Sequence, residues 1–343
     1  MSDGPDWTSP VQVGAAFRRF SGTGAEEQSP AKHIFAVDRA SWARACDLGV
    51  DIAASYLPLA RGTRRNNATT DWSANAIEKY VGIHHRVATK NIHAMQGEGL
   101  VEQLKRGSHP VYKLVLPATP DWIWLPNDVV TGTGAEISPL KLFWQARDVE
   151  ALRLFVELYY WNHLPTDGGI SRAVLRLAFK RHELVQIGEY RVWGFNQPHR
   201  VASGEAKFAA YYDLYCDHRL IEQAPHLCTS EEPEAGIIHP YGIGRGDCVE
   251  DRIGLAAHTA GLAMVSEDTR RQAEADGLWL APVRRHIANV QMVGVARLRY
   301  LPTTSSTDEW QREARGRGEE FIEGYQRLAS TSYRDSDIKV RSR

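Results

Sequence analysis

The chain has 343 residues, enough for two or three domains of ordinary size, and its 43% hydrophobic and 24% charged content is typical of a globular protein. Its formal net charge of −1 excludes a polycation, so any binding of nucleic acid must come from a local basic patch. No apolar run approaches the roughly 18 residues that span a bilayer, and the N-terminus has no basic and apolar signal segment. With four scattered cysteines, we expect a cytoplasmic protein without a membrane partner.

Changes in composition and turn-forming Gly and Pro residues divide the chain into six expected parts. Residues 1–32, rich in Gly, Ser, Pro and Glu, form a flexible leader, and residues 331–343 form a flexible basic tail. Between them we expect a first domain, a connector, a second domain and a C-terminal α+β domain. Their respective bounds are 33–120, 121–147, 148–245 and 246–330.

The first domain begins with apolar residues at helical spacing from Ser41 to Pro58. A polar loop with Arg64 and Arg65 follows, and Ser73 is a suitable N-cap for the next helix. Gly82 falls where a tight turn requires positive φ, and Ile83 would fill the angle before another helix.

That next helix has two contrasting faces. Val87, Ile92 and Met95 are expected to be buried together. The opposite face carries residues that suit contact with phosphate oxygens or base edges, namely His85, Arg86, Thr89, Lys90 and His93.

A hairpin with a basic tip is expected after this helix. Gly97 and Gly99 end the helix, Leu100 starts a strand, and Lys105 to Ser108 form the tip. From Arg61 to Lys113 there are nine Lys or Arg and four Asp or Glu, a local net charge of +5. This local charge is what a DNA-binding surface on a neutral protein requires.

Helix, tight turn, helix and basic hairpin is the order of a winged helix-turn-helix. The segment AIEKYVGI, then Val87, Ile92 and the turn GEGLVEQ, resembles the winged helix-turn-helix of bacterial regulators of the GntR and MarR type. The resemblance spans residues 45–116, about a fifth of the chain, and it departs at His84, where such families often place Ser or Thr. It implies binding of double-stranded DNA as a homodimer. The residues expected to contact DNA are Arg64, Arg65, Ser73, His84, His85, Arg86, Thr89, Lys90, His93, Lys105, Arg106 and His109.

Helical patterns after Asp148, Ser171 and Ser203, followed by two strand-like runs, repeat this order in the second domain. We therefore expect a mainly α fold with small β-hairpins (α+β), with two winged-helix units in tandem and a C-terminal α+β cap. Arg172, Arg176 and Lys180, with Arg181 beside them, would form a basic stripe on the middle helix. The stripe is either a second DNA surface or, more commonly for such patterns, a solvated helix face.

Cys216, His218, His226 and Cys228 could bind zinc, but their spacing matches no common finger, and neighbouring aromatic residues favour core packing. We therefore expect no metal and no cofactor. No catalytic motif stands out, so an enzyme is not expected.

The sequence thus predicts a bacterial, nucleoid-associated transcriptional regulator of repressor type, with the effector unspecified. One alternative is a replication initiator or partition protein of a plasmid or integrated mobile element. Another is a winged-helix scaffold that binds proteins and not DNA.

Overall fold

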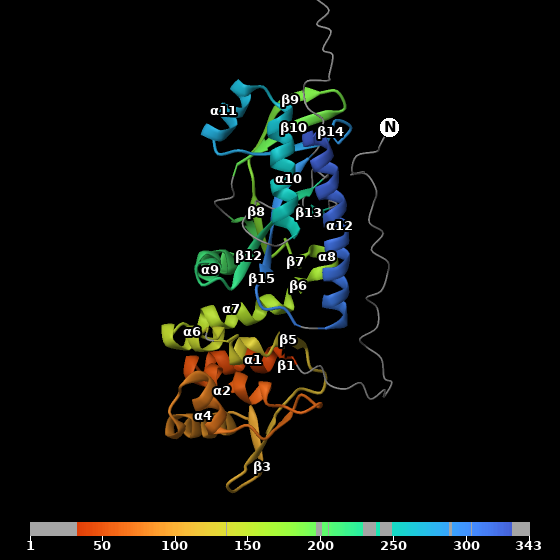
Figure 1. Cartoon of the computed structure of the whole chain (residues 1–343). Helices are drawn as coiled ribbons and strands as arrows, with labels where there is room; N and C mark the ends of the chain where they lie inside the picture. The colour runs from red at the N-terminus through yellow and green to blue at the C-terminus, as the bar shows by residue number, and fades with distance from the viewer. Residues whose placement is uncertain are drawn as a thin grey trace, which may run out of the picture.

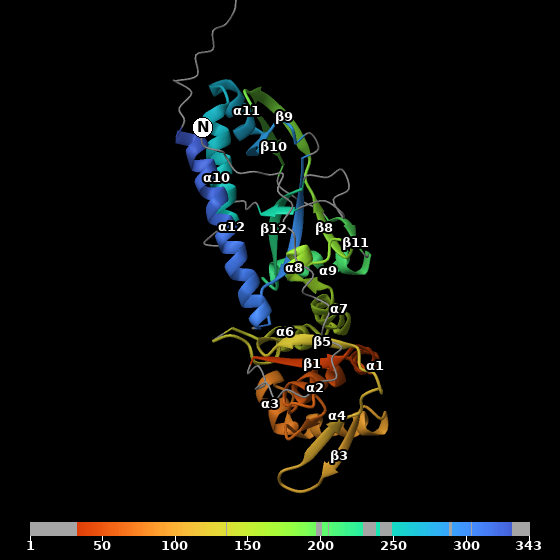
Figure 2. The same cartoon turned by 90° about the vertical axis from the view of Figure 1, so that its right-hand side faces the viewer.

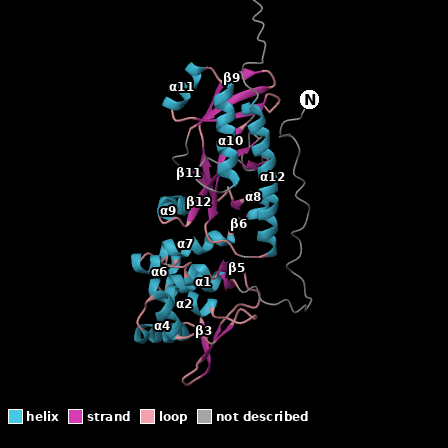
Figure 3. Ribbon diagram, viewed as in Figure 1, coloured by secondary structure: helices cyan, strands magenta, loops and turns pink. Residues whose placement is uncertain are grey.

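The computed structural model describes residues 33–134, 136–196, 201–204, 206–228, 238–240, 249–287, 290–302 and 304–330. The expected leader and tail therefore lie outside the described residues. Helices and small antiparallel sheets alternate along the described chain (Figure 3), which confirms the mixed α+β class.

The described chain is elongated, with different elements at its two ends. The β3–β4 hairpin (β3, Val101–Lys105; β4, Val111–Leu114) projects at one end, and strands β9, β10 and β14 lie at the other (Figures 1 and 2). Helix α7 (Val149–Tyr160) lies between the helices of the hairpin end and the larger sheet.

The hairpin end begins with β1 (Ile34–Asp38), which leads directly into helix α1 (Arg39–Asp47). The Asp38 carboxylate caps α1 by accepting a hydrogen bond from the Ser41 amide. Helix α2 (Val50–Arg61) follows after Gly49, whose φ of 102° interrupts the helix. The helical pattern expected from Ser41 to Pro58 is therefore two helices.

The next elements follow the predicted order. A short strand β2 (Thr69–Thr70) precedes α3 (Ala74–Val81) and α4 (His85–Gly97). Strands β3 and β4 form the hairpin, and β4 also pairs with β2, giving a three-stranded antiparallel sheet.

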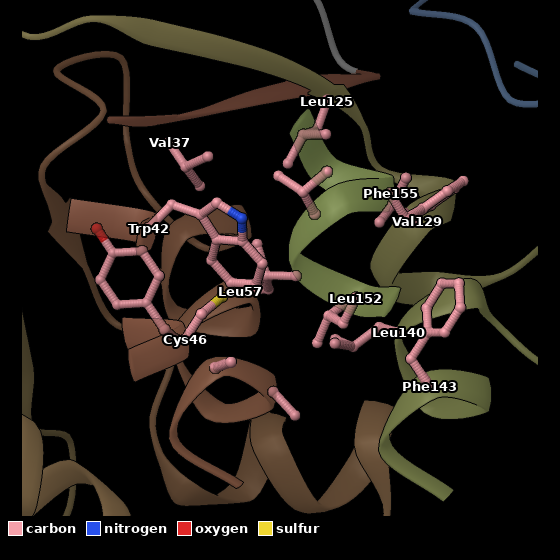
Figure 4. Packing of buried hydrophobic residues seen from close by; sticks show 14 of the residues in the cluster. Val37, Trp42, Cys46, Leu57, Leu125, Val129, Leu140, Phe143, Leu152 and Phe155 are labelled. Atoms are coloured by element: carbon pink, nitrogen blue, oxygen red, sulfur yellow. The ribbon is translucent and has the colours of Figure 1, made fainter. Parts of the chain in front are cut away.

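The expected connector is an integral part of this end of the molecule. Its strand β5 (Trp122–Pro126) pairs with β1 along five residues. Helix α5 (Asp128–Thr131) packs with α6 (Pro139–Ala146), and α6 packs with α7. Figure 4 shows their side chains, including Leu140, Phe143 and Phe155, facing Trp42 and Leu57 of α1 and α2.

The remaining sheets join segments from both expected C-terminal domains. The five-stranded sheet has the order β11-β8-β15-β12-β13, and a three-stranded sheet has the order β14-β10-β9. Because β15 lies between β8 and β12, a boundary at residue 245 does not separate two sheets. The bounds of these strands are β8 Leu175–Ala178, β9 Arg181–Ile187, β10 Tyr190–Phe195, β11 Val201–Gly204, β12 Ile221–Cys228, β13 Ile238–Pro240, β14 Trp279–Arg284 and β15 Gln291–Leu298.

The prediction of a helix after Ser171 is wrong, because strands β8 and β9 form in this region. Leu175 and Leu177 are buried on β8, and β8 pairs with β15 more than a hundred residues later. Tertiary pairing thus overrides the local helical pattern. The order helix, helix, helix, hairpin does not hold here, and the second winged-helix-like unit of residues 148–245 is not found.

Helices cover the larger sheets. α9 (Ala206–Asp217) packs against β12, and α10 (Val249–Met264) and the long α12 (Ser305–Ser330) lie side by side (Figures 1 and 2). α11 (Glu267–Ala275) lies near the end farthest from the hairpin. The remaining short elements are β6 (Asn162–His163), α8 (Leu164–Asp167) and β7 (Gly169–Ile170).

Hydrogen bonds made by Asn91 and by the Asp51 carboxylate fix α4 and α6 on α2. Buried Asn91 of α4 donates from Nδ2 to the Asp51 carbonyl oxygen at 3.1 Å and to Ser55 Oγ at 2.9 Å. The Asp51 carboxylate accepts from both terminal nitrogens of Arg147, at 2.6 and 2.9 Å, and from Trp144 Nε1 at 2.8 Å. The orientation of α4 is therefore set by hydrogen bonds as well as by apolar packing.

We predict that Asn91→Ala lowers the free energy of unfolding by about 1–3 kcal/mol, because it removes two buried hydrogen bonds. Urea unfolding followed by circular dichroism measures the change. Lys90→Ala is the matched control on the same helix, and its exposed side chain should leave stability within about 0.5 kcal/mol. Equal stabilities of the two variants would contradict the anchoring role of Asn91.

A second prediction concerns acid stability. Hydrogen bonds from Arg147 hold the pKa of Asp51 below its ordinary value, with a smaller contribution from Trp144, while burial opposes this shift. A carboxyl whose pKa is lower in the folded state stabilises the fold above its unfolded pKa, near 3.8, and this stabilisation disappears as pH falls through the folded pKa. Asp51→Asn should therefore destabilise the protein at pH 7 and less so at pH 3. Urea unfolding curves at both pH values measure the loss of unfolding free energy, and Asp213→Asn, at an exposed position, is the control. An equal loss at pH 7 and pH 3 for Asp51→Asn would contradict the prediction.

Candidate nucleic-acid interface

Six of the Lys and Arg residues expected to contact DNA lie exposed on three segments at the hairpin end, where Lys113 of β4 is exposed as well. We call these six the basic set. They come from the loop between α2 and β2, from α4 and from the β3–β4 hairpin. Its members are Arg64, Arg65, Arg86, Lys90, Lys105 and Arg106.

The charges of the basic set are not neutralised within the described part of the chain. None of the six forms an ion pair there, whereas arginines elsewhere do. Arg147 pairs with Asp51 at 2.6 Å and Arg252 with Glu319 at 2.7 Å. A surface with several unneutralised cations attracts a polyanion, and the attraction weakens as salt rises.

The start of α4 is fixed by two side chains that cap its first amides. His84 accepts a hydrogen bond at Nδ1 from the Arg86 amide, at 3.2 Å. Glu78 of α3 accepts one at Oε1 from the His85 amide, also at 3.2 Å. The imidazole thus supplies the cap that Ser or Thr gives elsewhere, and Gly82 makes the turn between the helices with a φ of 95°.

The residues expected on the exposed face of α4 are all at least partly exposed, and one residue expected in the core is exposed as well. His85, Arg86, Lys90 and His93 are exposed, and Thr89 is half-buried. Two of these side chains are bound within the helix: Thr89 Oγ1 donates to the His85 carbonyl at 2.9 Å, and His93 Nδ1 lies 3.0 Å from Gln96 Oε1.

The exception is Val87, which was expected in the core but is 44% exposed. The buried face of α4 consists of Ala88, Asn91, Ile92 and Met95. These follow the spacing i, i+3, i+4 and i+7, so they face α2 together, and Val87 lies outside that stripe. The side chain of Asn91 takes the place that sequence periodicity assigns to an apolar residue.

A hollow of about 800 Å³ separates α4 from the hairpin. His93 and Gln96 line it from α4, and Gln103 and Arg106 from the hairpin side. Glu102 contributes a carboxylate to the same hollow. His109 is exposed between the two strands, close in sequence to Arg106.

The other expected basic surface is not assembled. With no helix after Ser171, the spacing of Arg172, Arg176 and Lys180 no longer puts them on one stripe. Arg172 is buried and Arg176 half-buried, while Lys180 is exposed. The Arg181 guanidinium carbon lies 4.9 Å from the Trp193 ring centroid, and Nη1 donates to the Val290 carbonyl. The four residues therefore do not share one helix face.

The zinc candidates show other contacts. His226 is buried on β12, with Nδ1 2.6 Å from the Ala224 carbonyl oxygen and Nε2 3.4 Å from Arg297 Nη2. A guanidinium at that distance opposes a second cation. Cys216 and His218 lie at the end of α9, and the Cys228 side chain lies outside the described residues. Over the part of the chain that can be described, no group of three or more His, Cys, Asp or Glu is placed to hold a metal ion.

Within the same ranges, no helix has the length and apolarity needed to cross a membrane. Comparison with known protein families, curated proteins and solved structures finds no match to this chain.

We predict that His84→Ala increases hydrogen exchange at the Arg86 amide, because it removes the cap acceptor. The expected loss of helix stability is about 1 kcal/mol. His84→Ser is the matched variant and should retain protection, since a Ser hydroxyl accepts the same kind of bond. Equal protection of this amide in the wild type and His84→Ala would show that the imidazole does not cap α4.

Proposed function

We propose that this chain binds double-stranded DNA sequence-specifically through a winged helix-turn-helix formed by the elements from α2 to β4, and that it regulates transcription as a repressor. The observation that carries the proposal is the basic set, six exposed cations without carboxylate partners in the described structure, on a chain of net charge −1.

The order of elements supports the proposal. Three helices and three short strands follow one another as α2, β2, α3, α4, β3 and β4, and the strands form one antiparallel sheet. In a winged helix the third helix enters the major groove and the hairpin contacts the backbone or the adjacent minor groove. α4 has 13 residues and is therefore about 20 Å long, and the diameter of an α-helix, about 10–12 Å with side chains, fits a major groove about 12 Å wide.

The exposed residues of α4 divide into two chemical roles. Arg86 lies in the first turn, where side chains of a groove helix reach base edges, and a guanidinium can bind guanine O6 and N7 together. Lys90 lies four residues later on the same face. The hairpin residues Lys105 and Arg106 are placed to neutralise phosphates, which sets affinity more than specificity.

The first test selects DNA from a random-sequence duplex library with the full chain and measures affinity for the selected site. Arg86→Ala should weaken binding by about 1–3 kcal/mol and relax the preference at one position. Arg285→Ala, which removes an exposed arginine directly after β14, should leave affinity unchanged. Failure of the full chain to enrich any sequence would overturn the proposal.

The second test is the salt dependence of binding. Joint replacement of Lys105 and Arg106 by Ala should weaken binding to all sequences similarly. It should reduce the slope of log affinity against log salt by about 2 if both neutralise phosphates. An unchanged slope would remove the hairpin from the DNA interface.

The arrangement of the selected sites tests the biological role. An inverted repeat, with two copies of the chain per site in sedimentation measurements, is expected for a homodimeric regulator. Iterated direct repeats would instead indicate a replication initiator.

A further inference from the structure

On the hairpin, Leu104 beside Lys105 is 51% exposed, and on α4 the exposed large apolar side chain among basic residues is Val87. It lies in the first turn of α4 directly after Arg86 and three residues before Lys90. Single exposed apolar residues are common on proteins, and Ile137 and Leu255 are more exposed than Val87. What distinguishes Val87 is its position on α4 beside two cations, Arg86 and Lys90, that have no carboxylate partner in the described structure.

We propose that Val87 determines specificity by packing against the C5-methyl group of a thymine in the major groove. This inference rests on the proposed function, because it assumes that α4 enters DNA. It adds that one position of the bound site is recognised by an apolar contact.

The chemistry of the major groove limits the groups that a valine side chain can contact favourably. The base edges in the major groove present hydrogen-bond donors, acceptors and one apolar group, the thymine methyl. A valine side chain offers no hydrogen bond, so this methyl is its complementary partner there. Contact with it removes apolar surface of both groups from water, which favours binding.

Val87 is the one large apolar side chain exposed on α4, whereas Thr89 is half-buried. The hydroxyl of Thr89 donates to the His85 carbonyl, and His93 is held near Gln96. Helical geometry puts Val87 and exposed Ala94 on one flank of the ridge formed by Arg86 and Lys90, while Thr89 and His85 lie on the other. Arg86 and Val87, adjacent in the first turn, would therefore read neighbouring base pairs.

The experiment uses the full chain and the duplex obtained by selection. Each thymine of that duplex is replaced in turn by deoxyuridine, which lacks only the methyl group. At one position the wild type should lose about fourfold in affinity, as expected for one buried methyl-sized group. Val87→Ala should bind the thymine and deoxyuridine duplexes equally at that position, while keeping its response to guanine substitutions.

Leu255→Ala is the matched control, since it shortens an exposed apolar side chain on α10 and should keep the wild-type discrimination. Circular dichroism confirms that the variants are folded. If Val87→Ala retains the wild-type discrimination at every thymine, the inference is wrong while DNA binding stands.

A further outcome would indicate that Val87 contacts a partner protein and not DNA. In that case Val87→Ala would leave all DNA affinities unchanged but abolish a protein complex that Leu255→Ala preserves, and the inference would be overturned. Failure to select any DNA, by contrast, would overturn the proposed function itself.

Discussion

Asp51 is the residue through which α2, α4 and α6 are held in one arrangement. Its carbonyl oxygen accepts from Asn91 and its carboxylate from Trp144 and Arg147. Arg147 ends α6 in a left-handed conformation with φ of 60°, which is unfavourable for a residue with a side chain. The bidentate ion pair holds the chain there. The exposed face of α4 is thus oriented by a contact on its opposite side.

The hairpin end is also continuous with the rest of the molecule. One apolar core extends from β1 through α7 to β12 and β15. Tyr159 of α7 donates to the Tyr300 carbonyl at 2.9 Å, and Tyr215 of α9 donates to the Ala151 carbonyl at 3.0 Å. Both tyrosine side chains are buried. The basic set therefore lies on an end that is packed against the larger sheets, and not on a domain held by a linker.

The sequence predicts best where structure depends on neighbouring residues. Gly82 ends α3 with a φ of 95°, and α4 ends at Gly97, two residues before Gly99 with a φ of 65°. Ser73 is the N-cap residue of α3, as predicted, but its side chain makes no capping hydrogen bond. The hairpin follows for the same reason. The exposed basic residues were identified because charge on a helix face is visible in the spacing alone.

What the sequence could not show depends on contacts between distant segments. Arg172, Arg176 and Lys180 fit a helix by spacing, but β8 forms because β15 offers it a partner across the sheet. Asn91 is polar yet buried because Ser55 and the Asp51 carbonyl receive its amide. Val87, one turn before Asn91, lies at the edge of the buried stripe and is 44% exposed. Val87 is thus the residue of the candidate site that the hydrophobic pattern wrongly predicts to be buried.

The distribution of charge gives the molecule a preferred approach to a polyanion. Residues 61–113 carry a net charge of +5, so the other 290 residues, with 32 Lys or Arg and 38 Asp or Glu, carry −6. A phosphate backbone is attracted to the first region and repelled by the second, and the opposing charges orient the chain during diffusional encounter. The repulsion also limits binding in other orientations, which a uniformly basic protein does not achieve. A near-neutral total charge therefore does not exclude the proposed DNA binding, and the uneven distribution of charge would favour approach through residues 61–113.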